Sequence, residues 1–174
     1  AKMASLDYRF SQTVVGNLMR WNSEFPKLQL WQDSGNGPGA DVNTCYGGFW
    51  LHKLYPEEIS ESVWRKVPNS TLYQLNEAYL NYAEALNEYN EGPTQEAYDA
   101  INTIRKRSGQ PDLPTGLGYL EFRAKVRNER AIELAFDGHR FYDIRRWMIA
   151  EEEGVMQGGM LGIKIYQIPE STEY

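Results

Sequence analysis

Two glutamates four residues apart, Glu129 and Glu133, are the first residues that could do chemistry. This spacing places both side chains on one face of a helix. Glycoside hydrolases use two carboxyl groups, about 5 Å apart for retention or about 6.5 to 9.5 Å apart for inversion. One hypothesis therefore makes these glutamates the acid and the base of a sugar-cleaving site.

Arginines near the two glutamates favour a structural interpretation instead. Positive neighbours stabilise an ionised carboxylate, which removes the proton donor with raised pKa that glycoside hydrolysis needs. We therefore expect Glu129 and Glu133 to pair with arginines of the segment from Arg140 to Arg146, fixing how their helix meets the following turn. The predicted structural ion network consists of two glutamates and four arginines: Glu129, Glu133, Arg130, Arg140, Arg145 and Arg146.

The remaining residue types offer little other catalytic or metal chemistry. Cys45 is the single cysteine, so it cannot form an internal disulfide. His52 is a conceivable base for Cys45, but neither a third orienting residue nor a local signature accompanies the pair. With His52 and His139 as the two histidines, few soft ligands are available for a metal ion. We expect no catalytic residues, no metal site and no cofactor, and hence no enzyme.

Aromatic side chains in the first third of the chain could bind a sugar. Aromatic rings stack on the apolar face of a pyranose, while amides and carboxylates bind its hydroxyl groups. Polar side chains of this kind, such as Gln32 and Asp33, lie among the aromatic residues. The same rings could equally fill a core, and the sequence leaves that alternative open. The candidate carbohydrate-binding residues are Trp31, Trp50, Tyr46 and Trp21.

Composition and charge exclude several classes of protein. A hydrophobic fraction of 41% and a charged fraction of 24% are typical of a globular domain. The net charge of −6 argues against nucleic acid as a partner, because binding to phosphates relies on clustered Lys and Arg. No apolar run approaches the roughly 18 residues that suggest a membrane span, and no signal segment opens the chain. The irregular opening suggests a fragment whose leader and first half are missing.

The sequence from Leu72 onward predicts the helices that must position the glutamates. Apolar residues recur there in alternating steps of three and four, the spacing of one helix face. Gly92-Pro93-Thr94 ends the first helix, Leu72 to Tyr89, and begins a second from Gln95 to Ser108. We expect a tight antiparallel pair similar to the unit of tetratricopeptide solenoids. The predicted buried stripe comprises Leu72, Leu75, Tyr79, Tyr82, Leu86 and Tyr89.

A row of glutamates marks another side of the first predicted helix. Its members are Glu77, Glu84, Glu88 and Glu91. We interpret this row as a solvated face, which is the usual role of a run of charges on a helix.

The rest of the chain predicts more helix and little strand. A third helix should cover about Tyr119 to Phe136, with a helical turn at Phe141 to Trp147. Residues 1–70 are expected to be mostly loops, with a short strand at Phe10 to Val15. The predicted fold is mainly α and has four parts: a loop-rich segment at 1–70, the helix pair at 71–110, the third helix and following turn at 111–150, and an extended tail at 151–174.

Several sequence blocks occur in the order found in one known family. LYQLNEAYLNYAEA at 72–85 is similar to the pattern R-x-A-E-x-Y-L-N-Y-A-E-A, and AINTIRKRSG at 100–109 is similar to I-N-x-I-R-x-R-A-G. NERAIELAFDGHR at 128–140 and DIRRW at 143–147 resemble E-R-x-x-E-L-A-F-E-G-x-R and D-L-x-R-W. Upstream, DYRF at 7–10 with TVV at 13–15 resembles D-P-R-F-x-x-T-V. The chain therefore resembles the C-terminal portion of SusD/RagB family proteins.

This resemblance implies a function as well as a SusD-like fold. SusD/RagB proteins are surface lipoproteins of Bacteroidetes-type bacteria that bind glycans or other nutrients and cap a TonB-dependent transporter. The resemblance implies an outer-membrane, cell-surface location, with membrane attachment only through a lipid anchor absent from this chain. The implied partners are an oligosaccharide or other nutrient ligand and a SusC-like TonB-dependent transporter. The alternatives are a helical-repeat module that binds only protein, and a glycoside hydrolase.

Overall fold

The computed structural model describes residues 6–34, 36–37, 47–55, 71–158 and 162–166. The chain divides into two compact units. Unit 1 combines Ala1–Arg9 with Thr71–Ile149, and unit 2 combines Phe10–Ser70 with Ala150–Tyr174. Each unit thus joins two stretches that are distant in sequence. None of the helices in the described ranges is long and apolar enough to span a bilayer.

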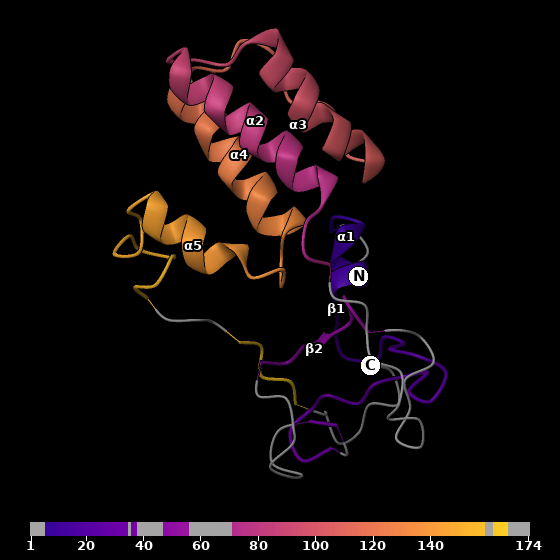
Figure 1. The fold of residues 1–174 in the computed structure, drawn as a ribbon. Coiled ribbons are helices and arrows are strands. Elements are labelled where there is room, and N and C mark those ends of the chain that lie inside the picture. Colours follow the sequence, from indigo (N-terminus) through magenta and orange to yellow (C-terminus); the bar gives the residue numbers. More distant parts are fainter. Residues whose placement is uncertain (1–5, 35, 38–46, 56–70, 159–161, 167–174) are drawn as a thin grey trace. The chain divides into compact units, whose positions relative to one another are not determined.

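Unit 1 is helical (Figure 1). Its helices are α2 at Leu75–Tyr89, α3 at Gln95–Arg107, α4 at Tyr119–Glu133 and α5 at His139–Arg146. Helices α2 and α3 lie side by side, and α4 packs along α2. The side chain of Thr94 caps α3 by accepting a hydrogen bond from the Ala97 N–H at 3.3 Å. The predicted antiparallel pair is confirmed, and its helix ends fall within three residues of those expected.

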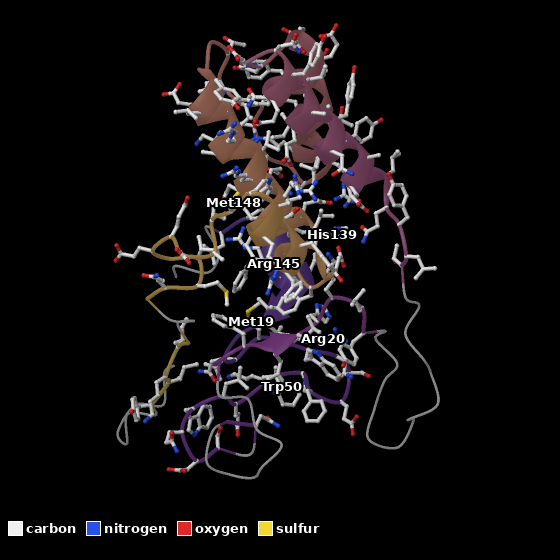
Figure 2. All side chains as sticks on the ribbon, turned by 60° about the vertical axis from the view of Figure 1, so that its left-hand side comes forward. Met19, Arg20, Trp50, His139, Arg145 and Met148 are labelled. Carbon is white, nitrogen blue, oxygen red and sulfur yellow. The ribbon has the colours of Figure 1, made fainter. Side chains whose placement is uncertain are left out.

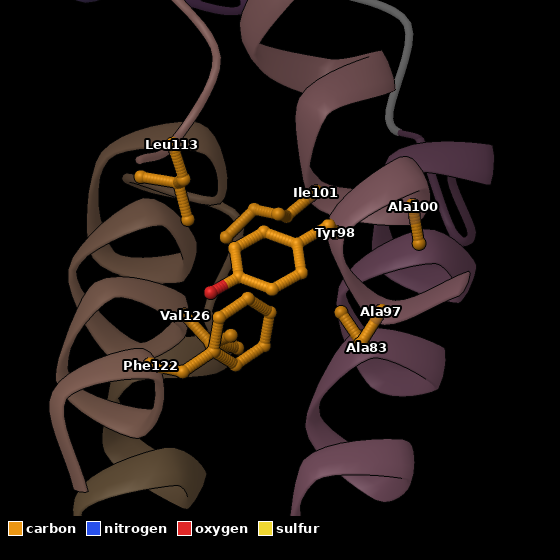
Figure 3. Close-up of a cluster of buried hydrophobic side chains, with 8 residues drawn as sticks. All are labelled: Ala83, Ala97, Tyr98, Ala100, Ile101, Leu113, Phe122 and Val126. Atoms are coloured by element: carbon orange, nitrogen blue, oxygen red, sulfur yellow. The ribbon is translucent and has the colours of Figure 1, made fainter. Parts of the chain in front are cut away.

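The core of unit 1 lies among α2, α3 and α4 (Figure 3). Phe122 is fully buried, and its ring meets that of Tyr98 edge to face with centroids 4.9 Å apart. Ala83 on α2 and Ala97 on α3 lie together, and their small side chains let the two helices approach closely. The buried cluster comprises Ala83, Ala97, Tyr98, Ala100, Ile101, Leu113, Phe122 and Val126.

The buried face that the sequence predicted for α2 is only partly correct. Tyr79 and Leu86 of the predicted stripe are partly buried and pack against the core of unit 1. Four of the six residues in the predicted stripe are exposed: Leu72, Leu75, Tyr82 and Tyr89. The buried residues of α2 are instead Leu80, Ala83 and Asn87, which follow the same three- and four-residue spacing. Two faces of the helix therefore satisfy the pattern. The buried face is the one with smaller side chains, because close helix packing favours alanine over tyrosine at the contact.

Tyr82 provides a direct test of this corrected orientation. Its side chain is 51% exposed on α2, so Tyr82→Asp should change the free energy of unfolding by no more than about 0.5 kcal/mol. The original expectation of a buried ring at this position would instead predict severe destabilisation. Urea denaturation followed by circular dichroism distinguishes the two orientations. A decrease in the free energy of unfolding of more than about 2 kcal/mol would show that Tyr82 is buried.

Unit 2 has little regular structure in its described residues. Helix α1 spans Arg9–Thr13, and its first residue belongs to unit 1. Strands β1 (Val14–Val15) and β2 (Trp50–Leu51) pair antiparallel. The strand predicted from Phe10 is therefore restricted to its last two residues, since the residues before Val14 form a helical turn.

A small core holds the loops of unit 2 together. Val15, Trp21, Leu28 and Leu30 are buried in one cluster. The Leu18 N–H donates to Leu28 O at 2.8 Å, and the Leu28 N–H donates to Met19 O at 2.9 Å. Hydrogen bonds between loop backbones thus replace those that a larger sheet would supply.

Candidate carbohydrate site

Four aromatic rings from two segments, 21–25 and 50–55, form one cluster in unit 2. Trp21 lies 5.8 Å from Trp50, 5.9 Å from Phe25 and 6.0 Å from Tyr55, measured between ring centroids. Phe25 and Trp50 also contact each other, with centroids 5.6 Å apart. Trp50 is labelled in Figure 2 together with Met19, which packs against the same core. The structure thus brings two of the four predicted sugar-binding residues into contact.

The four rings of this cluster differ in exposure. Trp21 is only 9% exposed, and its indole N–H donates to Leu51 O at 2.9 Å. Trp21 therefore supports the cluster from inside and has no free donor for a sugar. Trp50 and Phe25 are half-buried, and Tyr55 is 44% exposed. Any ring surface that the cluster offers to a ligand belongs to these three residues.

Trp31 belongs to a different turn of unit 2. Its carbonyl oxygen accepts hydrogen bonds from Ser34 N at 3.1 Å and Ser34 Oγ at 2.6 Å. A Cβ atom at Gly37 would lie 1.9 Å from the same oxygen, so only glycine fits there. The Trp31 side chain is half-buried, which leaves part of it at the surface. Tyr46, the fourth predicted binding residue, lies outside the described residues.

Sequence reasoning missed Phe25 and Tyr55 as members of the ring cluster. The position of Phe25 depends on Asn22, a buried residue whose side-chain oxygen accepts from Glu24 N at 3.0 Å and Phe25 N at 2.9 Å. An asparagine that closes a turn in this way is a recognisable local signal. The short sequence spacing between Trp21 and Phe25 across such a turn could have indicated ring contact.

The two glutamates of α4 form buried ion pairs in unit 1. Glu129 accepts hydrogen bonds from Arg9 Nη1 at 2.5 Å and from Arg105 Nη1 at 2.8 Å. Glu133 accepts from the same Arg9 atom at 2.8 Å, from Asn76 Nδ2 at 2.6 Å, and from Arg107. Each carboxylate is thus occupied by several charged or amide donors, an arrangement typical of a structural ion-pair cluster.

The predicted partners of these glutamates are wrong. The segment from Arg140 to Arg146 does not supply them. Arg146 binds Glu84 and Asp143, while Arg145 donates to Phe141 O at 2.7 Å. Arg140 is exposed and makes no ion pair among the residues that the structure describes. The segment does not reach the two glutamates because Arg146 is directed toward Glu84 of α2 and Asp143 of α5, while Arg145 bonds to the carbonyl of Phe141 on its own helix.

Arg130 belongs to a second ion-pair cluster. Its guanidinium donates to both carboxylate oxygens of Asp143 at 3.1 Å and to Asn81 Oδ1 at 2.6 Å. Glu84 of α2, at 13% side-chain exposure, accepts from Arg146 and from Trp147 Nε1. The expectation that the glutamate row of α2 is solvated is therefore wrong at Glu84. That residue instead joins α2 to α5.

Asp7 and Arg9 complete the first ion-pair cluster, and sequence reasoning did not include them. Arg9 Nη2 donates to Asp7 Oδ2 at 2.6 Å, while Arg9 Nη1 reaches both glutamates. These carboxylates raise the pKa of Arg9 against the opposing effect of burial. The available signal was the DYRF block at 7–10, which resembles the D-P-R-F pattern and contains both residues.

The pKa of Glu133 gives this cluster a defined pH dependence. Burial would raise the pKa, but hydrogen bonds from Arg9 and Asn76 and the charge of Arg107 outweigh burial and lower it below 4.5. The hydrogen bond from Arg9 likewise lowers the pKa of Asp7 below 3.8. A carboxyl group whose pKa is lowered on folding stabilises the protein above the unfolded-state pKa. That stabilisation is lost as the pH falls through the folded-state pKa.

Glu133→Gln should therefore be less stable than the unchanged protein at pH 7, and this difference should shrink below about pH 4. The amide of glutamine does not titrate, whereas Glu133 becomes protonated and loses its attraction for the arginines. Urea denaturation of both proteins at pH 7, 5 and 3.5 measures the difference. A gap of equal size at all three values would show that the charge of Glu133 does not contribute.

Comparisons with known proteins agree on one family. The SusD family model matches residues 1–174. SusD-like protein P25 of Formosa agariphila is 29% identical over 148 residues, which is 82% of this chain and 23% of that protein. SusD-like protein P2 of the same organism is 40% identical over 83 residues, which is 44% of this chain and 16% of that protein.

Solved structures of Bacteroides fragilis proteins are also similar. One SusD-like protein aligns with a TM-score of 0.70 at 30% identity, over 83% of this chain and 28% of its own. Another, described as a SusD-like carbohydrate binding protein, aligns with a TM-score of 0.71 at 27% identity, over 84% of this chain and 29% of its own. The chain spans about a quarter of the length of these relatives. Because the family model matches its whole length, this chain belongs to the SusD family.

Proposed function

We propose that this chain is part of a non-catalytic cell-surface protein that binds glycans or other nutrients for delivery to a TonB-dependent outer-membrane transporter. The observation that carries the sugar-binding part is the ring cluster of unit 2, in which buried Trp21 supports half-exposed Trp50 and Phe25 and exposed Tyr55. Rings held in this way present apolar surface to a pyranose at little entropic cost. One solved relative is described as a carbohydrate binding protein, which supports the same ligand class.

Membership of the SusD family supports the cellular part of the proposal. The proposed partner is a SusC-like transporter, and the proposed location is the outer membrane at the cell surface, with a lipid anchor on the full-length protein. Co-purification of the tagged full-length protein with a TonB-dependent barrel from outer membranes would test this part. Recovery of the protein in the periplasmic fraction without a barrel would contradict it.

The state of the glutamates supports a role without catalysis. Glu129 and Glu133 are both buried and held by arginines, and they share Arg9 as a partner. A retaining or inverting glycosidase needs one carboxyl group that keeps its proton. Incubating the full-length protein with each glycan that it binds and analysing the products tests this part. Release of shorter sugars, lost in Glu133→Gln, would make the protein a hydrolase.

Replacing Trp31 and Trp50 together with alanine should reduce glycan affinity by roughly ten-fold or more. Each stacked ring contributes on the order of 1 kcal/mol, which corresponds to several-fold in affinity. The full-length protein is first screened against glucose, xylose, mannose and galacturonic acid hexasaccharides. The tightest of these is then titrated calorimetrically against the double variant.

Tyr89→Ala is a suitable control for the tryptophan variants. Tyr89 is 88% exposed at the end of α2, so its substitution should change neither stability nor affinity. Unchanged affinity in a folded Trp31→Ala, Trp50→Ala protein would remove these rings from the site. Absence of binding by the unchanged protein to any of the four hexasaccharides would contradict the proposed ligand class.

A further inference from the structure

The segment at 162–166 is fixed between two loops of unit 2. The Ile163 N–H donates to Gly47 O at 3.2 Å, and the Gln32 N–H donates to Ile165 O at 2.8 Å. A Cβ atom at Gly48 would lie 2.4 Å from Ile163 O, and the φ of Gly48 is +76°, so glycine is required there on two grounds. The segment is therefore held on both sides through its backbone.

The side chains of this segment divide between the core and the surface. Ile165 packs against the buried cluster of unit 2. Successive side chains of an extended chain point in opposite directions, so Lys164 and Tyr166 face the other way. Both are exposed, and 63% of Tyr166 is accessible. The Lys164 Nζ atom lies 5.3 Å from the centroid of the Tyr166 ring.

The backbone hydrogen bond between Gln32 and Ile165 places the side chains of Gln32 and Asp33 near Lys164 and Tyr166. The hydrogen bond with the Tyr166 hydroxyl raises the pKa of Lys164, and the negative charge of Asp33 adds to this shift. Gln32 Nε2 donates to Asp33 Oδ1 at 3.0 Å. Asp33 itself has a φ of +64°, a conformation that Asp and Asn tolerate better than most residues. A carboxylate, an amide, an ammonium group and an aromatic ring are thus gathered on one surface.

We propose that Gln32, Asp33, Lys164 and Tyr166 form a saccharide subsite, in which Asp33 accepts from and Lys164 donates to neighbouring hydroxyl groups of a neutral sugar ring. Tyr166 supplies apolar ring surface at the edge of the same subsite. The inference rests on the proposed function and specifies its ligand class. A neutral sugar fits because vicinal hydroxyl groups both donate and accept hydrogen bonds. The charges of Asp33 and Lys164 offset each other, so the subsite has no net positive charge with which to favour the carboxylate of a uronic acid.

Three single substitutions in the full-length protein test this subsite. Lys164→Met keeps the length of the side chain but removes its donors, Asp33→Asn keeps the backbone conformation but removes the charge, and Tyr166→Ala removes the ring. Each should weaken binding of the tightest neutral hexasaccharide from the four-sugar screen by about five-fold. Tyr166→Phe, which keeps the ring, should bind within about two-fold of the unchanged protein.

Tyr73→Ala is the matched control, since Tyr73 is 65% exposed in unit 1 and has no place in the subsite. Unchanged affinity in all three folded variants would overturn the inference while leaving the proposed function intact. Tighter binding of the galacturonic acid hexasaccharide than of every neutral one would also overturn it. If the unchanged protein binds none of the four, the proposed function fails, and the inference fails with it.

Discussion

Replacing Glu129 with glutamine should lower the free energy of unfolding by about 3 to 5 kcal/mol. Glu129 is 1% exposed, and it accepts hydrogen bonds from two arginines, Arg9 and Arg105. Glutamine preserves the size of the side chain but carries no charge. The guanidinium groups of the two arginines would then lose their negative partner in a buried place that water does not fill. Removing one partner of a buried ion pair therefore lowers the free energy of unfolding more than an exposed ion pair raises it.

Urea denaturation at pH 7, followed by circular dichroism, measures this loss. Glu91→Gln is the control, because Glu91 is exposed in the connection between α2 and α3 and makes no ion pair among the described residues. The control should remain within about 0.5 kcal/mol of the unchanged protein. If Glu129→Gln were as stable as the control, the buried ion pairs would contribute nothing to folding.

Replacing Phe122 with alanine should cost about 3 to 5 kcal/mol. Phe122 has no exposed surface and contacts Tyr98 edge to face at the centre of the buried cluster of unit 1. The substitution removes the transfer free energy of a phenyl ring and leaves a cavity. Helices α2, α3 and α4 all border this cluster, so they cannot collapse into the space without moving one another.

Leu120→Ala on the same helix is the control for Phe122→Ala. Leu120 is 67% exposed, and alanine is at least as good a helix former as leucine, so the control should stay within about 0.5 kcal/mol of the unchanged protein. The melting temperature and the urea midpoint of both variants give the comparison. A similar stability for the two variants would show that the contact between Phe122 and Tyr98 is not part of a close-packed core.

The helices of unit 1 could be predicted because their signals are local. Gly92-Pro93-Thr94 sets the end of α2 and the start of α3, and Thr94 caps α3 as its residue type suggests. The orientation of α2 could not be predicted in the same way. Tyr82 and Ala83 are neighbours on two faces with the same periodicity, and only the packing of α3 and α4 decides which of the two is buried.

The ion-pair partners were mispredicted because sequence proximity was used as a guide to contact. Arg145 and Arg146 are close to Glu133 in sequence, yet Arg9 is the residue that reaches it. In the candidate carbohydrate site, residue type alone indicated Trp21 and Trp50 as candidates, and the structure places their rings in contact. Which of the two is buried depends on the loop contacts around Leu28 and Leu30, for which the sequence carries no periodic signal.

Arg9 is separated by 120 residues from Glu129 and by 124 residues from Glu133. A contact between residues distant in sequence requires closure of a long loop. The chain loses conformational entropy on closing this loop before the contact can contribute any stabilisation. The turn between α2 and α3, in contrast, needs only a short closure. We therefore expect the helices to form first and the Arg9 ion pairs to follow the folding transition state. Removing the Arg9 ion pairs by substitution should then mainly increase the unfolding rate of unit 1. Arg9 thus governs how long the folded unit persists and not how quickly it forms.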